Sequence, residues 1–439
     1  VSLSGSRYSI CSKNLPGLIP FAEEVLDIKV LPDPQIKEVK KKYISKQKVN
    51  KKFMNEITSI FDEDRFSSSE EERLLHSHGQ TTSDEVYKVL YSRLETFTDL
   101  VFYIESEEEA KTLIELAKKH NVCLIPFGGG TSVSNALKIP RNEKRMVVSV
   151  DTRRMNKIEH IDKENLLATV QSGILGVDLE NELQKNGYTA GHEPDSIEFS
   201  TLGGWISTNA SGMKKHRYGN IEDIVQNITL VTPKGTIRQI KPLTRSSFGV
   251  KPQNLIFGSE GNFGIITKAT IRIHKKPEAS TFESILFHNW EDGVAFMKRV
   301  SRSNLIPASS RLMDNSMVRF ASALKEKKTG FKKAMEFIKN FFVFKVRGFD
   351  PKKCVVAIFK MEGSHQEVLY QKKNLKVLAN DFNPIFAGSA QGKSGYNLTL
   401  AIAYIRDFFM DQNIIGETLE SAVPWSDVIK VSEAVTKKL

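Results

Sequence analysis

The chain has few cysteines and no long apolar run. Three of its 439 residues are cysteines, and Cys11, Cys123 and Cys354 lie far apart without the spacing of a metal site. A disulfide framework of the kind found in small secreted domains is therefore not expected, and a reducing compartment is favoured. No apolar stretch approaches the roughly 20 residues that a membrane-spanning helix requires. The length exceeds one compact core, which predicts two or three domains.

Two common phosphate-binding motifs are also missing. No G-x-G-x-x-G follows a predicted strand, which argues against a Rossmann dinucleotide fold, and no complete G-x-x-x-x-G-K-[ST] P-loop is present. The net charge is nevertheless +11. Such a charge suits a phosphate-bearing ligand, an anionic membrane surface or nucleic acid, and it selects none of them.

The most informative stretch is the glycine-rich segment 126–134, which directly follows an apolar strand pattern. Its three consecutive glycines allow the backbone to approach a ligand closely and to take positive φ. Successive N–H groups in such a turn form a concavity that attracts anions. Thr131 and Ser132 add hydroxyl groups at the same place. By itself the segment fits a diphosphate cradle and an ordinary tight turn equally well.

Two later glycine-rich stretches favour the cradle. Residues 200–212 combine Gly, Ser, Thr and Asn with only three bulky apolar side chains, a composition that fits close backbone approach to a polar ligand better than a structural loop. Residues 255–266 carry three further glycines and lead into a predicted strand at 268–273. Three such turns beside β structure are typical of a long ligand with several polar groups, such as an extended dinucleotide.

The pattern of apolar residues predicts three regions. Residues 1–95 form an accessory segment, 96–276 a ligand-binding domain, and 277–439 a second domain. In the middle region a strand at 100–104, a helix after the Ser106–Glu109 capping box and a strand at 122–126 form a βαβ unit. Hairpins are expected at 158–161 with 166–170 and at 228–232 with 236–240. The last region is predicted to be α+β with an antiparallel sheet.

Four segments, in this order and spacing, resemble the FAD-binding domain of the vanillyl-alcohol-oxidase-type (PCMH-type) flavoproteins: 126–132, 194–196, 201–204 and 258–264. Residues 207–215, 218–223, 311–315, 403–407 and 424–425 are most similar to the ether-lipid synthase branch of that superfamily. The resemblance covers about residues 15–439. It implies an α+β fold in which a largely helical N-terminal segment precedes a two-subdomain FAD-binding domain and an α+β cap domain.

The resemblance also implies a reaction. Enzymes of this branch exchange the acyl chain of acyl-dihydroxyacetone phosphate for a long-chain fatty alcohol. The products are alkyl-dihydroxyacetone phosphate and a fatty acid, formed through a covalent adduct at flavin N5 without net redox change. A homodimer on the lumenal side of the peroxisomal membrane is expected, with no nucleic acid partner. The alternatives are an FAD-dependent dehydrogenase or oxidase of 2-hydroxy acids and a non-catalytic flavoprotein.

The cofactor-binding residues implied by the resemblance come from four segments. They are Pro126, Phe127, Gly128, Gly129, Gly130, Thr131 and Ser132; Asp195, Ser196, Ile197, Glu198, Phe199, Ser200 and Thr201; Thr208, Asn209, Ala210 and Ser211; and Glu260, Gly261, Asn262, Phe263, Gly264, Ile265 and Ile266. The glycine turn contains no histidine to which flavin could be attached, so non-covalent FAD is expected. His192 is interpreted as a structural histidine. No metal site is expected.

Two arginines are candidate catalytic residues, because a guanidinium stays charged and binds phosphates or developing oxyanions bidentately. Arg311 lies among small and apolar residues, where Asp314 is its alternative, purely structural partner. Arg245 precedes the third glycine stretch, and a surface arginine is its alternative interpretation. The family's C-terminal histidine cluster is absent from the nine histidines here, and we expect it in sequence beyond Leu439.

One segment of the cap region mixes aromatic and basic residues. Residues 331–349 contain several phenylalanines between lysines and an arginine. Such a segment fits either a surface that docks on a membrane and admits long chains, or a core helix and strand with solvated lysines. The core helix is the favoured interpretation.

Overall fold

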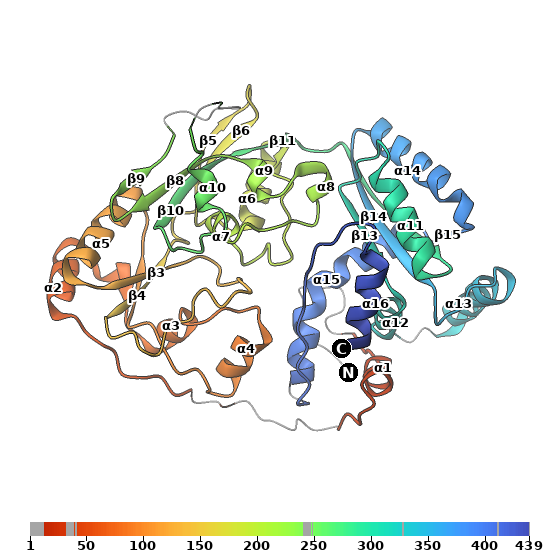
Figure 1. Cartoon of the computed structure of the whole chain (residues 1–439), viewed down its shortest axis with the longest axis horizontal. Coiled ribbons are helices and arrows are strands. Elements are labelled where there is room, and N and C mark those ends of the chain that lie inside the picture. Colours follow the sequence, from red (N-terminus) through yellow and green to blue (C-terminus); the bar gives the residue numbers. More distant parts are fainter. Residues whose placement is uncertain are drawn as a thin grey trace. The chain divides into compact units, whose positions relative to one another are not determined.

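The computed structural model describes residues 13–31, 39, 42–239, 247, 249–326, 329–410 and 412–438. The chain divides into two compact units (Figure 1). One unit is Lys37–Lys276, and the other combines Val1–Ile36 with Pro277–Leu439. The segment 1–95, expected as one accessory region, is therefore divided between the two units. We call them the FAD unit and the cap unit, after the two domains that the sequence resemblance predicts.

The first sheet of the FAD unit has the strand order β1-β2-β4-β3. Strands β2 (Leu100–Tyr103) and β3 (Cys123–Phe127) both run parallel to β4 (Val147–Asp151), whereas the short β1 (Phe66–Ser67) is antiparallel to β2. Helix α5 (Glu107–His120) connects β2 to β3, which confirms the predicted βαβ unit. Because β3 and β4 are parallel, the glycine turn after β3 and the residues after β4 lie at the same edge of the sheet.

Several helices of the FAD unit precede or cover this sheet. Helix α2 (Lys51–Ile60) packs on α5, and its Phe53 and Ile57 are fully buried in the same core as the sheet. Between α2 and β2 lie η1 (Glu63–Arg65), α3 (Glu70–Leu75) and α4 (Ser83–Leu90). This part of the N-terminal segment is thus integrated into the FAD unit.

The second sheet of the FAD unit is antiparallel, with the order β5-β6-β10-β8-β9. Its strands are β5 (Ile158–Asp162), β6 (Leu167–Gln171), β10 (Ile265–Arg272), β8 (Val225–Thr232) and β9 (Gly235–Ile237), and both predicted hairpins are present. Its core is shared with α6 (Gly176–Lys185), α7 (Leu202–Thr208) and α9 (Ile221–Ile224). The remaining elements are β7 (Tyr188–Thr189), which pairs with β11 (His274–Lys275), α8 (Lys215–Tyr218) and α10 (Gln253–Ile256).

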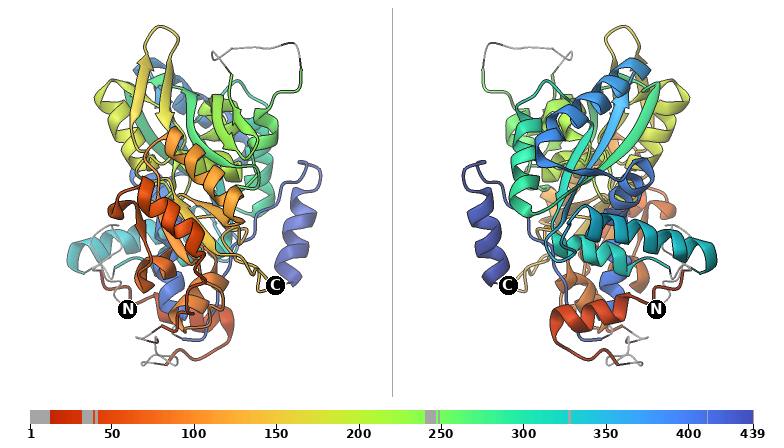
Figure 2. Two further views of the ribbon diagram at one scale, coloured as in Figure 1. Left: turned by 90° about the vertical axis from the view of Figure 1, so that its left-hand side faces the viewer. Right: turned by 90° about the vertical axis from the view of Figure 1, so that its right-hand side faces the viewer.

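The cap unit contains one antiparallel sheet with the order β13-β14-β12-β15, as predicted for this region. The strands are β12 (Ala279–Phe287), β13 (Ser309–Met313), β14 (Val355–Gly363) and β15 (Ile385–Phe386). Helices α11 (Trp290–Ser301) and α14 (His365–Ala379) share a core with one face of the sheet, and α15 (Ser389–Met410) packs on the other (Figures 1 and 2). Helices α1 (Leu18–Leu26) and α12 (Asn315–Ala323) pack with α15. The short η3 (Asn380–Phe382) and α16 (Val428–Lys438) complete the unit.

Helix α13 (Gly330–Phe341) and the π-helical turn η2 (Phe342–Val346) have an exposed apolar surface. Phe331 is 79% exposed and Phe337 is 72% exposed, and Ile338 and Phe341 are also exposed. The interpretation of this segment as a core helix is therefore wrong. The periodicity of an amphipathic helix is visible in a sequence, but whether another element covers its apolar face is not.

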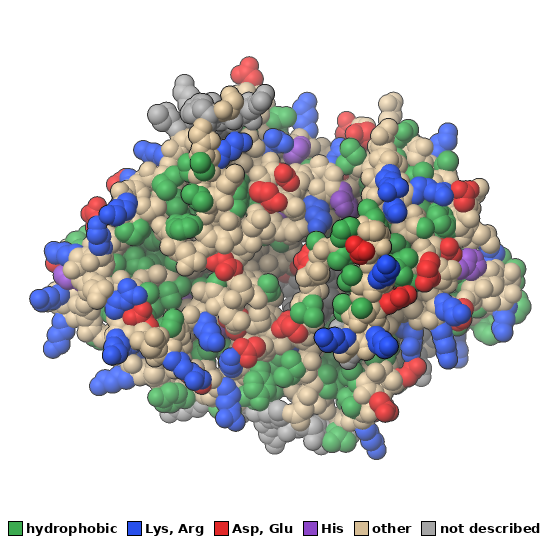
Figure 3. Space-filling model, viewed as in Figure 1, with side chains coloured by type: hydrophobic (Ala, Val, Ile, Leu, Met, Phe, Trp, Pro, Cys, Tyr) green, Lys and Arg blue, Asp and Glu red, His purple; other side chains and the backbone are tan. Residues whose placement is uncertain are grey.

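Basic side chains are dispersed over one face of the molecule. On the face shown in Figure 3, lysine and arginine side chains are distributed among acidic and uncharged ones instead of forming one continuous band. Among the described residues, no helix is both long and apolar enough to cross a membrane.

Candidate flavin site

A pocket of the FAD unit collects all three glycine-rich stretches at the carboxyl edge of β3 and β4. It comprises about 970 Å³ of space between atoms, including open solvent at its mouth. Sixteen of the predicted cofactor-binding residues line it: Pro126, Phe127, Gly128, Gly129, Gly130, Thr131, Ser132, Ser196, Ser200, Thr201, Thr208, Ala210, Glu260, Gly261, Gly264 and Ile266. Segments up to 140 residues apart in sequence thus share one cavity.

The glycine turn is packed so closely that side chains are excluded from it. A Cβ atom at Gly129 would collide with the carbonyl oxygen of Phe199, and one at Gly128 would collide with the Thr201 hydroxyl. Gly130 has a φ of +64°, a conformation that residues with a side chain adopt at a cost. Each of the three glycines is therefore required by the local structure.

The backbone N–H groups of residues 128–132 are available to a ligand. Within the part of the chain that the structure describes, none of them donates a hydrogen bond to another backbone carbonyl. Buried or half-buried N–H groups are almost always paired, so a row of them at a pocket wall indicates a bound acceptor. An anionic group such as a diphosphate is the acceptor that such a concavity favours.

The third glycine-rich stretch, residues 255–266, contacts the first two. The N–H of Glu260 donates to the Ser207 carbonyl oxygen (2.9 Å), and the Ser134 hydroxyl donates to the Glu260 carboxylate. The backbone of Gly261 takes a φ of +83° and lies against the ring of Pro126, where an added Cβ would come within 3.0 Å. These contacts fix the relative positions of the three stretches around the pocket.

The second stretch forms helix α7, which its sequence does not predict. Thr201 accepts a hydrogen bond from the Gly204 N–H (3.1 Å) and so caps the helix, and the Trp205 indole donates to the Ser200 hydroxyl (2.8 Å). A Cβ at Gly203 would come within 2.9 Å of the Ser172 side chain. The small residues are needed for this packing as well as for the pocket, and their low helix propensity hides the helix.

The other predicted cofactor-binding residues do not line this pocket. They are Asp195, Ile197, Glu198, Phe199, Asn209, Ser211, Asn262, Phe263 and Ile265. Ile265 is 1% exposed and belongs to the core of the first sheet, because neighbouring residues of β10 alternate in direction. Asn209 ends α7 with a φ of 50°. Both residues therefore have structural tasks next to the pocket.

Nine further residues line the pocket without having been predicted. They are Ala136, Leu137, Thr152, Ser172, Pro194, Gly203, Gly204, Trp205 and Ser207. Gly203, Gly204, Trp205 and Ser207 belong to the unusual stretch 200–212, whose composition was the available signal. Thr152 and Ser172 are single polar residues that follow β4 and β6, and nothing local in the sequence distinguishes them.

His192 is buried behind the pocket wall. It is 3% exposed, and its ring packs edge-on against Trp205 with 4.8 Å between ring centroids. Within the described ranges neither ring nitrogen has a hydrogen-bond partner. Burial, and to a lesser extent the charge of Lys214, lower the pKa of His192 to about 4. The imidazole is therefore neutral at pH 7.

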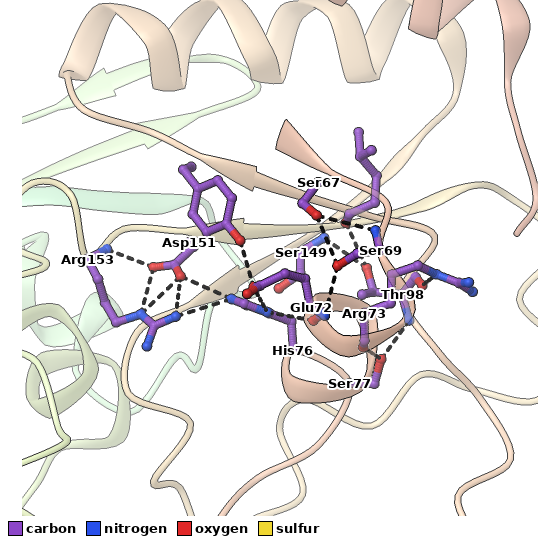
Figure 4. A network of polar contacts seen from close by, with 12 residues as sticks. Ser67, Ser69, Glu72, Arg73, His76, Ser77, Thr98, Ser149, Asp151 and Arg153 are labelled. Atoms are coloured by element: carbon purple, nitrogen blue, oxygen red, sulfur yellow. Dashed lines mark hydrogen bonds and ion pairs between the residues drawn. The ribbon is translucent and has the colours of Figure 1, made fainter. Parts of the chain in front are cut away.

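A polar network includes Asp151, the last residue of β4, at the carboxyl edge of the first sheet (Figure 4). The His76 ring contacts the Glu72 carbonyl oxygen through Nδ1 (2.8 Å) and the Asp151 carboxylate through Nε2 (3.0 Å), and Arg153 also pairs with Asp151 (2.6 Å). Burial alone would raise the pKa of Asp151, but the hydrogen bonds from His76 and Arg153 outweigh it and lower that pKa below its usual range. His76 also lies against Phe127, with ring centroids 4.4 Å apart.

Of the two candidate catalytic arginines, the structure describes one. Arg311 lies on β13 opposite Ile358 of β14 and borders a hollow of the cap unit together with His288 and Asp350. Asp314 caps α12 by accepting a hydrogen bond from the Met317 N–H (2.8 Å). Arg245 lies outside the described residues.

Two family profiles match the chain, one in each unit. The family described as FAD binding domain matches residues 98–241, and the family described as FAD linked oxidases, C-terminal domain, matches residues 276–439. An alkyldihydroxyacetonephosphate synthase of Caenorhabditis elegans is 39% identical over 99% of this chain and 72% of that protein. The chain belongs to the alkyldihydroxyacetonephosphate synthase family. FAD is accordingly its cofactor.

Two further comparisons bear on the choice between a synthase and a 2-hydroxy acid dehydrogenase. A solved alkyldihydroxyacetonephosphate synthase structure superposes with a TM-score of 0.86 at 31% identity, covering 98% of this chain and 77% of that one. A mitochondrial D-lactate dehydrogenase of Saccharomyces cerevisiae is 30% identical, but over only 55% of this chain and 41% of that protein. The superposition and the two family matches confirm the predicted fold class, an FAD-binding domain followed by a cap domain.

The pocket fits this cofactor. The N–H groups of residues 128–132 suit the diphosphate of FAD, hydroxyls of Thr201 and Thr208 offer further hydrogen bonds, and Trp205 and Ile266 provide apolar surface. When bound, FAD supplies the reactive ring, whereas the chain supplies binding and orientation. Among the described residues that line the pocket there is no histidine.

Proposed function

We propose that this protein is an alkyldihydroxyacetonephosphate synthase that exchanges the acyl chain of acyl-dihydroxyacetone phosphate for a long-chain alcohol. The similarity to the Caenorhabditis elegans synthase carries the proposal, because it extends over 99% of the chain and so includes both units. Over the whole reaction the alcohol oxygen becomes bonded to the dihydroxyacetone phosphate carbon and the acyl chain leaves as a fatty acid. No electrons are gained or lost.

The roles proposed for this chain's residues follow from their chemistry. The glycine turn holds FAD non-covalently through its backbone, so the pocket needs no residue that attaches flavin. Arg311 binds the substrate phosphate or the oxyanion that develops at its ketone, since a guanidinium is always charged and offers paired donors. When bound, FAD would supply an electron-accepting ring, and the residues of the pocket would hold and orient it.

The test is an exchange assay with the holoprotein. Acyl-dihydroxyacetone phosphate and a labelled C16 alcohol are added, and fatty acid release and labelled ether product are measured together. We expect both products in equal amounts and only when the alcohol is present. Bleaching of the flavin by D-lactate under anaerobic conditions, without ether product, would instead support the dehydrogenase alternative that the D-lactate dehydrogenase relative suggests.

We further propose that α13 and η2 dock on a membrane that delivers the long-chain substrates. The support is the exposed apolar surface of Phe331, Phe337 and Phe341 with exposed lysines between them, a combination suited to an anionic lipid surface. In Figure 3 hydrophobic and basic side chains lie next to one another over α13. A peroxisomal location and a homodimer belong to the same proposal and are tested by cell fractionation and by sedimentation.

Liposome sedimentation tests the docking surface. Phe337→Glu should weaken binding to vesicles of anionic phospholipid several-fold, because a charge replaces an exposed apolar side chain. Leu419→Glu is the matched control, since Leu419 is 80% exposed in the same unit but lies outside α13 and η2. Equal binding of the two variants would refute the assignment of α13.

A further inference from the structure

The loop of residues 77–82 contacts the carbonyl groups of the glycine turn. This loop connects α3 to α4 and precedes residue 98, where the match to the FAD-binding family begins. The N–H of Gln80 donates to the Gly130 carbonyl oxygen (2.7 Å), and the Thr81 hydroxyl donates to the Thr131 carbonyl oxygen (3.1 Å). The Gln80 amide also reaches the Gly129 carbonyl oxygen (3.4 Å). Three consecutive carbonyls of the turn are thus held by one loop.

The loop is itself fixed from its C-terminal side. The Glu85 carboxylate, on a residue that is 5% exposed, accepts hydrogen bonds from the Gly79 N–H (2.6 Å) and the Thr82 hydroxyl (2.8 Å). A Cβ at Gly79 would come within 2.5 Å of that carboxylate. A buried carboxylate held by two donors is costly to disrupt, so it is a rigid support.

The loop is equally fixed where it leaves α3. The Ser77 hydroxyl accepts a hydrogen bond from the Thr98 N–H (2.8 Å), and Arg73 donates to the Thr98 carbonyl oxygen (2.8 Å) (Figure 4). His76 adds the contacts with Asp151 and Phe127 described above. The α3 end of the loop is therefore tied to β3 and β4, whose ends carry the pocket, and its α4 end is held by Glu85.

We propose that residues 79–85 position the FAD diphosphate cradle, with Thr81 and Gln80 as positioning residues that act through the glycine turn. A glycine-rich turn has many accessible conformations, and selecting one of them costs entropy. By holding the carbonyls of residues 129–131, the loop fixes the peptide planes and leaves the N–H groups for the ligand. In its absence FAD binding itself would have to order the turn, and affinity would fall.

The experiment compares three threonine variants of the full chain by FAD titration of the apoprotein and by its melting temperature. Thr81→Ala removes the hydrogen bond to Thr131 and should raise the FAD Kd by about 3- to 10-fold, the usual value of one such bond. Thr81→Ser keeps the hydroxyl and should restore binding to within about twofold. Thr58→Ala is the matched control, because the Thr58 hydroxyl also donates to a backbone carbonyl (2.9 Å), on α2 and far along the chain.

The outcomes separate positioning from mere structure. The proposal requires a raised Kd for Thr81→Ala with an apoprotein melting temperature like that of Thr58→Ala. It is overturned by an unchanged Kd, by a Thr81→Ser variant as weak as Thr81→Ala, or by equal Kd values for Thr81→Ala and Thr58→Ala. The unsubstituted chain is titrated in parallel, so a failure of FAD binding as such is recognised separately.

Discussion

The FAD pocket is formed mainly by backbone atoms, whereas the sheet of the cap unit presents side chains. The pocket is made mainly of backbone and small side chains, and two of its glycines, Gly129 and Gly264, lie against backbone carbonyls that cannot move aside. The cap unit presents charged and apolar side chains, such as Arg311, on an ordinary antiparallel sheet. A site made of backbone is intolerant of added atoms, whereas a site made of side chains depends on chemical identity. This difference orders the effects expected from substitution.

The largest effect should come from a single methyl group in the cradle. Gly129→Ala would place its Cβ against the Phe199 carbonyl, so the turn must distort and we expect FAD affinity to fall by about 100-fold or more. Gly416→Ala is the control, because no atom lies within 4 Å of its added Cβ. Flavin fluorescence titration measures both. An affinity within threefold of the unsubstituted chain would contradict the backbone account.

The same difference decides what the sequence could reveal. Glycines forced by close packing, as at residues 128–130, remain visible as a run, so the cradle and its cofactor were predictable. Helix α7 was not, because Gly203, Gly204 and Ser207 serve the pocket at the expense of helix propensity. Thr152 and Ser172 enter the pocket only through the topology of their strands. The exposed face of α13 depends on which neighbours cover it, and this information is tertiary.

The next largest effect is the loss of folding stability that His192 causes at low pH. Its pKa is lowered to about 4 in the fold from an ordinary value of 6.5, so the unfolded chain binds the extra proton between these values. Stability is fully present above pH 6.5 and is lost as the pH falls toward 4. Compared with His192→Phe, the unsubstituted chain should lose on the order of 3 kcal/mol more between pH 7 and pH 4. Urea unfolding at both pH values checks this, and parallel pH profiles would contradict it.

Substitution of Arg311 tests whether the cap unit depends on the chemical identity of a side chain. Arg311→Lys keeps the positive charge but loses the planar pair of donors, so we expect FAD affinity to be unchanged and the rate of alkyl exchange to fall by about 10-fold or more. Arg302→Lys, at an exposed position of the same unit, is the matched control. Undiminished exchange by Arg311→Lys would remove this residue from the proposed reaction.

The smallest effect is expected for a glycine that faces side chains. A Cβ at Gly293 of α11 would approach terminal methyl groups of Leu312 and Val355, at 2.8 and 2.9 Å. These groups can shift, and alanine favours the helix by about 1 kcal/mol, so Gly293→Ala should change stability by no more than about 1 kcal/mol. FAD affinity should stay within twofold. A loss of flavin here as large as that of Gly129→Ala would erase the contrast between the two units.

The central claim is that residues 126–132, 200–210 and 260–266 hold FAD through their backbone and without a covalent bond. Its most direct test is reconstitution of the apoprotein with excess FAD, gel filtration and acid precipitation. The account predicts a flavin spectrum that co-elutes with the chain at one FAD per chain and passes completely into the acid supernatant. A chain that elutes without flavin, or flavin that stays with the precipitate, would contradict it.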